Sequence, residues 1–155
     1  MSTETMSRFL DRIEQAFAEG DAEVGHKATE AGHVRLTREM YHHIIRGDFE
    51  SAFRNFHDDI ELEITGPEGL PFRGRWRGRD EVSRAILENF SGVEEQQPEI
   101  QHVVAQGDTV IVIARERGRF KGPGTDYDLH WAQLFTFRDG KAILIRELVD
   151  GHSIC

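Results

Sequence analysis

The fold is decided by residues 108–150, which read DTVIVIARERGRFKGPGTDYDLHWAQLFTFRDGKAILIRELVD. Three runs rich in β-branched, aromatic and other apolar residues lie within it, at 110–117, 127–137 and 142–149. Turn-forming sequences separate the runs, Gly-Pro-Gly between the first two and Arg-Asp-Gly-Lys between the last two. This composition and punctuation are typical of strands joined by turns. The stretch therefore predicts three consecutive antiparallel strands.

Two carboxylates, Glu116 and Glu147, interrupt the apolar faces of the first and third predicted strands. Because strand side chains alternate between the two faces of a sheet, each carboxylate shares its face with three aliphatic residues. A carboxylate in such surroundings is costly unless it lines a cavity, pairs with a cation or takes up a proton. The aliphatic neighbours are Val110, Val112 and Ala114 for the first strand and Ile143, Ile145 and Val149 for the third.

The face on which Glu147 lies depends on the turn before the third strand. If residues 139–140 form a two-residue type I′ turn, Glu147 pairs with Ala132. If residues 138–140 form a three-residue loop with a left-handed glycine, Glu147 pairs with Trp131 and lies beside Gln133. A slip of one residue turns a whole strand over, and the sequence is compatible with both turns.

Composition excludes several classes of protein. A chain of 155 residues is long enough for one domain that buries about 68–70% of its unfolded surface. The net charge of −9 argues against non-specific binding of nucleic acid. The one cysteine, Cys155, excludes an intrachain disulfide and a thiolate metal cluster. No apolar run approaches the roughly 20 residues of a membrane span, and the polar N-terminal residues lack a signal-peptide pattern, so we expect a cytoplasmic protein.

No cofactor is expected. The sequence contains no glycine fingerprint for a dinucleotide, no P-loop and no HExxH motif. His102 and His130 lack carboxylates at the spacing of a metal site. The basic residues between 73 and 79 predict a solvated loop and strand edge.

The chain divides into an N-terminal segment, 1–33, and a main domain, 34–155. Apolar residues at helical spacing predict an amphipathic helix at 3–19, and Gly20 ends it. We expect this helix to pack on the main domain or on a second subunit. The glycine-punctuated residues up to 32 predict a linker.

The middle of the chain mixes helices and strands. Apolar periodicity predicts helices at 34–46 and 49–57 and another that begins at Arg79, with strands at 60–64 and 100–105. Helices segregated from an antiparallel sheet indicate the α+β class.

Short motifs recur in a characteristic order from about residue 36 to residue 150. They are Tyr41, GD at 47–48, FHDDI at 56–60, GRD at 78–80, GDTV at 107–110, GTDY at 124–127, FTFRDGK at 135–141 and Asp150. This set resembles the SnoaL-like, ketosteroid-isomerase-like branch of the NTF2-like (cystatin-like) superfamily. The resemblance implies a cone in which a curved antiparallel sheet wraps around helices and encloses an apolar pocket, and it implies a homodimer. The fold is shared by several enzyme classes and by non-enzymatic binders, so it does not fix the function.

Only part of the ketosteroid-isomerase site has a counterpart in this sequence. The position of their catalytic base resembles Ile64, that of their oxyanion acid lies near Gln133, and that of their tyrosine lies near Met40. Because the base is missing, steroid isomerisation of that type is not expected.

Two other branches of the superfamily resemble this chain at its carboxylates. The carboxylate positions of limonene-epoxide-hydrolase-like proteins look like Glu116 and Glu147, although their arginine position holds Ala114 and their water-holding residues correspond to Leu62 and Ile64. SnoaL-type polyketide cyclases place a carboxylate near Glu147 and a histidine near Gln133. Transfer of Glu147 into a pocket implies the three-residue loop.

Two readings of the carboxylates stay open. In the structural reading they lie at an exposed edge or form ion pairs with neighbouring arginines. In the functional reading they share the pocket, where each raises the proton affinity of the other, so that Glu147 acts as a base and Glu116 as an acid. The arginines are Arg115, Arg117, Arg119 and Arg146.

The remaining candidates form the wall of the expected pocket. Gln133 would bind a substrate carbonyl or hydroxyl, and aromatic and apolar residues would surround it, although ordinary core packing is the competing reading for each. His130, Ala132 and Leu134 lie on the opposite face and predict a dimer interface. The wall candidates are Trp131, Phe135, Met40, His43, Tyr127 and Ile64.

The predicted function is a pocket for a small hydrophobic or polyketide-like molecule. If the protein is an enzyme, we expect a cofactor-free isomerase, cyclase, dehydratase or hydrolase. The alternative is a non-catalytic ligand-binding or dimerising module.

Overall fold

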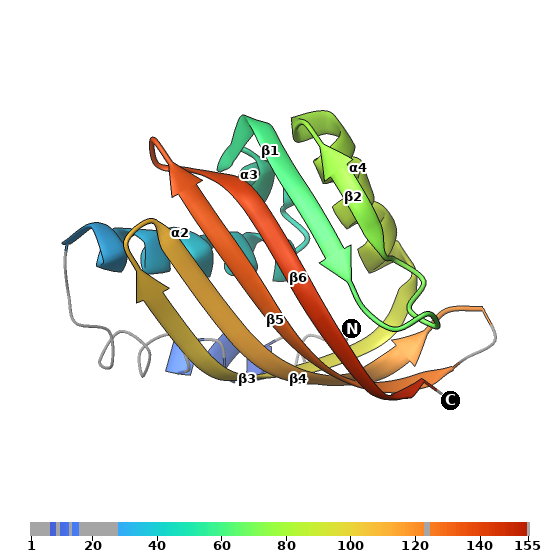
Figure 1. Cartoon of the computed structure of the whole chain (residues 1–155). Helices are drawn as coiled ribbons and strands as arrows, with labels where there is room; N and C mark the ends of the chain where they lie inside the picture. The colour runs from blue at the N-terminus through green and yellow to red at the C-terminus, as the bar shows by residue number, and fades with distance from the viewer. Residues whose placement is uncertain (1–6, 9, 13, 16–27, 123–124, 155) are drawn as a thin grey trace.

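The structure is a computed structural model that describes residues 7–8, 10–12, 14–15, 28–122 and 125–154. Figure 1 shows α2, α3 and α4 on one side of a curved sheet, which confirms the predicted α+β class and cone-like fold. The elements are α2 (Ala28–Ile45), α3 (Phe49–Phe53), β1 (Phe56–Thr65), β2 (Gly74–Arg77), α4 (Arg79–Ser91), β3 (Val93–Gln106), β4 (Thr109–Phe120), β5 (Asp126–Arg138) and β6 (Lys141–Ile154).

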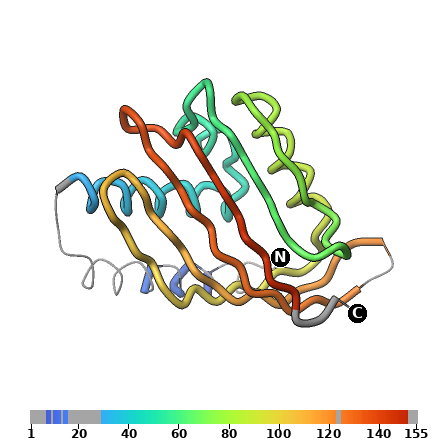
Figure 2. The backbone as a smooth tube through the Cα atoms, viewed as in Figure 1, coloured from blue at the N-terminus to red at the C-terminus, as the bar shows by residue number. Residues whose placement is uncertain are grey.

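The strands form one mixed sheet in the order β2-β1-β6-β5-β4-β3. Neighbouring strands are antiparallel except for β1 and β6, which run parallel. The first strand thus lies beside the last, a pairing that local sequence patterns do not reveal. The backbone trace in Figure 2 shows the long strands bending as they pass the helices.

The hairpin between β5 and β6 has a two-residue turn. Asp139 and Gly140 both have positive φ, 53° and 75°, as a type I′ turn requires. The three-residue loop implied by the family resemblance is therefore wrong. This turn alone would pair Glu147 with Ala132 and point the carboxylate away from the helices.

A β-bulge just beyond the turn reverses that outcome. The register shifts between Thr136 and Phe137, so that Ile143 of β6 has no partner in β5. One extra residue on one strand moves every later side chain of that strand to the opposite face. Glu147 consequently pairs with Gln133, and both side chains point toward the helices. Neither pairing expected from the turn alone is correct.

Strand β3 is longer than expected and contains Pro98. A strand was predicted only from about residue 100, but β3 begins at Val93. Proline has no backbone N–H to donate, which an edge strand tolerates, and β3 is an edge strand. The extension places Gln96 on the sheet.

Two helix boundaries also differ from the predictions. Helix α2 begins six residues before residue 34, and its first turn is anchored because the Glu30 carboxylate accepts a hydrogen bond from the Gly107 backbone N–H at 3.0 Å. Helix α3 ends at Phe53 instead of continuing to residue 57, and Phe56 begins β1. The Phe56 side chain is 1% exposed, because it packs in the core as a strand residue.

The predicted N-terminal helix lies mostly outside the described residues. Those that are described, 7–8, 10–12 and 14–15, are helical. The carboxylate of Glu14 lies 2.5 Å from His42 Nε2 on α2, so this part of the segment contacts the main domain.

The outer face of the sheet retains apolar exposure. Leu148 is 53% exposed and Val104 is 48% exposed. Ala132 pairs with Leu148 and Ile113 pairs with Ala132, while Val104 pairs with Ile111 in another row of the sheet. A homodimer through this face stays a prediction. Within the described residues, no helix is both long enough and apolar enough to span a membrane.

Candidate functional site

A cavity of about 150 Å³ lies between the inner face of the sheet and helices α2 and α4. Its wall is mainly aromatic and aliphatic, with contributions such as Leu62, Phe72 and Ile145. Lysine, arginine and histidine are absent from its described lining. The ionisable groups that line it are Tyr41, Glu116, Tyr127 and Glu147.

Glu116 reaches the cavity through the alternation of β4. Val110, Val112 and Ala114 of the same strand are fully buried, and Glu116 continues their row with 8% exposure. The Gln96 side-chain amide donates a hydrogen bond to Glu116 Oε1 at 2.5 Å. The edge strand β3 thus supplies the polar partner of this carboxylate.

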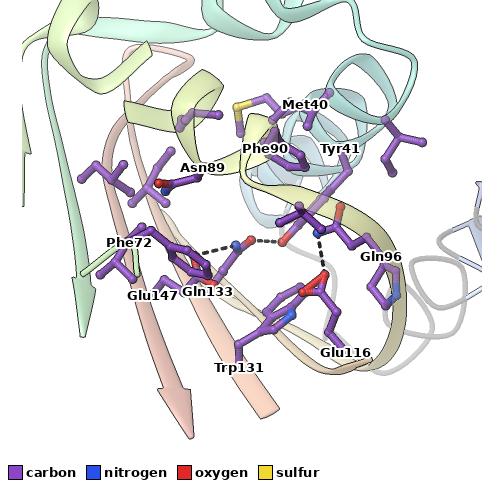
Figure 3. A pocket seen from close by; sticks show the side chains of 18 of the residues that line it. Met40, Tyr41, Phe72, Asn89, Phe90, Gln96, Glu116, Trp131, Gln133 and Glu147 are labelled. Carbon is purple, nitrogen blue, oxygen red and sulfur yellow. Dashed lines mark hydrogen bonds between the residues drawn. The ribbon is translucent and has the colours of Figure 1, made fainter. Parts of the chain in front are cut away.

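Glu147 reaches the same cavity from β6. Gln133 Nε2 donates a hydrogen bond to Glu147 Oε2 at 3.2 Å. The carbonyl oxygen of the same Gln133 amide accepts a hydrogen bond from the Tyr41 hydroxyl on α2. Figure 3 shows the Gln133 amide between Tyr41 and Glu147, and Gln96 directed at Glu116.

Both carboxyl groups hold protons more tightly than a solvated glutamate does. Burial raises the pKa of Glu116 from 4.5 to about 8. The hydrogen bond from Gln96 opposes this rise, the charge of Glu147 adds to it, and a hydrogen bond from Trp131 also opposes it. Burial raises the pKa of Glu147 to about 7, and the hydrogen bond from Gln133 opposes the rise. Both acids therefore keep their protons to a pH well above that at which a solvated glutamate ionises.

The tyrosines of the cavity stay protonated when the carboxyls ionise. Burial, followed by the charges of Glu147 and Glu116, raises the pKa of Tyr41 well above its usual value of 10. Burial and the charge of Glu116 also raise the pKa of Tyr127. Both hydroxyls are neutral hydrogen-bonding groups at physiological pH.

The ion pairs suggested by the structural reading do not form. The arginines next to the carboxylates in sequence point to the other face, where they bind other acids, so the cavity carboxylates receive no charge compensation from them. The pairs are Arg115–Asp128 at 2.6 Å, Arg117–Asp128 at 3.6 Å, Arg119–Asp126 at 2.8 Å and Arg146–Glu63 at 3.4 Å.

Most of the predicted wall residues do line the cavity, and one does not. His43 lies outside the lining, with Nδ1 at 3.4 Å from Asp48 Oδ2. Adjacent helix positions point about 100° apart, so Tyr41 and Ile44 face the cavity while His43 faces the end of the helix. The predicted residues that line the cavity are Glu116, Glu147, Gln133, Trp131, Phe135, Met40, Tyr127 and Ile64.

Tyr127 reaches the cavity across β4. It pairs with Gly118, and a Cβ atom on that glycine would lie 2.4 Å from the Tyr127 hydroxyl. A side chain at Gly118 would therefore displace the ring. The hydroxyl donates to the Glu95 backbone carbonyl at 3.4 Å and to neither cavity carboxylate.

Three polar residues that line the cavity were not among the predicted site residues, namely Tyr41, Asn89 and Gln96. Tyr41 was one of the motif residues that carry the family resemblance, and it follows Met40, the position near that of the family tyrosine. Gln96 lies before the strand predicted from residue 100, and no local pattern identifies it.

The arrangement can carry a proton between two points of a ligand. One carboxyl group can accept a proton while the other donates one, and the glutamine amides hold hydrogen bonds to both. No group of three or more His, Cys, Asp or Glu side chains among the described residues is arranged to hold a metal ion.

Comparison with known proteins gives a consistent family. The SnoaL-like domain family matches residues 37–145. Among curated proteins, none matches this chain.

Solved structures share the fold. An NTF2-like protein from Burkholderia xenovorans LB400 is 25% identical, with 77% of this chain and 89% of that chain covered and a TM-score of 0.66. TerC, co-crystallised with polyporic acid, is 21% identical, with 75% and 89% covered and a TM-score of 0.62. An LEH-like epoxide hydrolase of M. tuberculosis is 17% identical, with 78% and 84% covered and a TM-score of 0.61.

Proposed function

This chain belongs to the SnoaL-like domain family, and we propose that it is a cofactor-free acid–base enzyme that acts on a small hydrophobic molecule. One observation carries the proposal: two carboxyl groups with raised pKa values line one apolar cavity without a compensating cation among its described lining. A carboxyl group whose pKa is strongly shifted by burial in a cleft is a candidate for a functional site.

Glu147 is the base and Glu116 is the acid in this proposal. With pKa values of about 7 and about 8, a state with Glu147 ionised and Glu116 protonated is populated between these pH values. Glu147 removes a proton from the bound molecule and Glu116 delivers one elsewhere. General acid–base assistance of this kind contributes about 10²–10⁴ in rate.

The cavity selects for size and charge. An engineered protein cavity of roughly 150 Å³ holds benzene, so a volume of about 150 Å³ fits a molecule built on one ring. Carboxylates without a basic neighbour repel an anionic ligand, and the net charge of −9 acts in the same direction. The substrate class is therefore a compact, largely apolar molecule without a negative charge.

The two carboxyl groups suit several subclasses of acid–base reaction, and the substrate decides among them. Isomerases, cyclases, dehydratases and hydrolases each need one acid and one base, and the fold is shared with both TerC and an LEH-like epoxide hydrolase. The competing function is a non-catalytic module whose pocket is filled by its own side chains. The open cavity argues against a filled pocket, and the two buried carboxyl groups are the feature that favours an enzyme.

Titration of the two carboxyl groups tests the proposal. In ¹³C NMR of protein labelled at glutamate side chains, assigned with the Glu116→Gln and Glu147→Gln variants, both carboxyl resonances should titrate well above the ~4.3 of a solvated glutamate. Values near 7 for Glu147 and near 8 for Glu116 are expected. If both groups titrate near the solvated value, the enzyme proposal loses its basis.

Ligand charge gives an independent prediction. At pH 8, ligand-observed NMR should show benzyl alcohol or acetophenone binding at least about tenfold more tightly than benzoate, because the ionised carboxyls repel a like charge. The difference should shrink at pH 5, where both cavity carboxyls are protonated, and in Glu147→Gln. Equal binding of benzoate at pH 8 would contradict the charge argument.

A further inference from the structure

Each cavity carboxylate has a glutamine amide as a hydrogen-bond partner. Glu116 receives a hydrogen bond from the Gln96 amide and a further one from the Trp131 side chain, and Glu147 receives one from the Gln133 amide. The Gln133 carbonyl is itself held by the Tyr41 hydroxyl. No described side chain donates in this way to the carbonyl of Gln96. One amide is therefore anchored at both ends and the other at one end.

An anchored amide and an unanchored amide favour different protonation states. A side-chain amide has a donor end and an acceptor end, and its orientation follows from its partners. Gln96 can turn, so it can donate to an ionised Glu116 or accept from a protonated one. In the observed arrangement the Tyr41 hydroxyl donates to the Gln133 carbonyl, which leaves the Gln133 N–H directed at Glu147. Turning Gln133 would give up this donation and place its carbonyl against Glu147. Donation to a carboxylate favours its ionised form.

We propose that Tyr41 is a positioning residue that makes Glu147, and not Glu116, the base, by holding the Gln133 amide with its N–H directed at Glu147. This inference rests on the proposed function, because it assigns the roles within the same carboxyl pair. Tyr41 is suited to the task since its own pKa is raised, so its hydroxyl keeps its proton while the carboxyls titrate.

Few other groups near Glu147 can influence its pKa. The opposing residue on β1 is Ile64, which is apolar, and the partner on β5 is the uncharged Gln133. The ionisable groups that line the cavity with Glu147 are Tyr41 on α2, Glu116 on β4 and Tyr127 on β5.

The test is the Tyr41→Phe variant, which removes one oxygen and keeps the ring. We expect the titration midpoint of Glu147 to rise by about one unit or more, to that of Glu116 or above it, while the midpoint of Glu116 moves less. The measurement is ¹³C NMR of the side-chain carboxyls in the full chain. Tyr127→Phe is the matched control, because Tyr127 lines the same cavity and its hydroxyl donates to a backbone carbonyl. This control should leave Glu147 within about 0.3 units of wild type.

A double-variant cycle shows whether Tyr41 acts through Gln133. Gln133→Leu should itself raise the midpoint of Glu147, and adding Tyr41→Phe to that background should change it by less than about 0.3 units. A shift of Glu147 by Tyr41→Phe that persists in the Gln133→Leu background overturns the inference, and so does an unchanged midpoint in the single variant. In both cases the raised wild-type midpoints still support the proposed function. Wild-type midpoints near the solvated value overturn both proposals together.

Discussion

Replacing Glu116 with glutamine should increase the free energy of unfolding at pH 9 by several kcal/mol, while leaving it within about 1 kcal/mol of wild type at pH 4. Glutamine keeps the shape of the side chain and its ability to accept the hydrogen bond from Gln96. It cannot ionise, so the cost of a buried charge at high pH disappears. The small residual effect at low pH reflects the new amide N–H₂ group, which needs its own partner.

The sign follows from proton linkage. The pKa of Glu116 is 4.5 in the unfolded chain and about 8 in the folded protein, so the folded state holds the extra proton between these values. The stabilisation is fully present below pH 4.5 and is lost as the pH rises through about 8. At about 1.4 kcal/mol per unit, the loss is at most about 5 kcal/mol. Glu147, with a pKa of about 7, should account for a smaller loss of stability over a lower pH range.

Urea unfolding from pH 4 to pH 9 measures the effect. The difference between Glu116→Gln and wild type should grow with pH and level off above pH 8, and a smaller difference is expected for Glu147→Gln. Glu68→Gln is the control, because Glu68 is an exposed loop residue outside the cavity. A constant difference across this range would show that Glu116 titrates like a solvated carboxyl.

The sequence predicted the environment of Glu116 because that environment is local. The residues of β4 alternate without interruption, so three buried aliphatic neighbours determine which way the carboxylate points. The same reasoning failed for Glu147. Its face depends on a turn and on a β-bulge at Ile143, and no alternation pattern in the sequence predicts the bulge. The two-residue turn and the bulge have opposite effects on the face of the strand, and they cancel. The family resemblance therefore placed Glu147 on the cavity side although the loop that it implied is wrong.

The features missed from the sequence are those that depend on distant contacts. The parallel pairing of β1 with β6 joins opposite ends of the domain. Gln96 becomes a site residue only because edge strand β3 continues through Pro98. Tyr41 contacts Gln133 only because α2 packs on the sheet with the Tyr41 side of the helix facing β5. Alternation and periodicity describe one element at a time, so they do not contain this information.

The largest effect on activity is expected from Glu147→Gln. For any neutral ring compound that wild type turns over, kcat/KM should fall by about 10²–10⁴, the contribution of a general base. Binding of that compound should change little, because glutamine has the same shape and the apolar wall is untouched. Turnover assays with ligand-observed NMR on the same samples separate the two quantities.

The pH profile tells a base from a residue that merely shapes the cavity. Activity needs Glu147 ionised and Glu116 protonated. The activity of the wild-type protein should therefore rise as the pH passes about 7 and fall as it passes about 8. The residual activity of Glu147→Gln should lose the rising limb, and that of Glu116→Gln should lose the falling limb. Glu68→Gln should keep both limbs. Unchanged turnover in Glu147→Gln would remove this residue from the mechanism, because a glutamine amide cannot accept the proton that the proposed reaction transfers to the carboxylate.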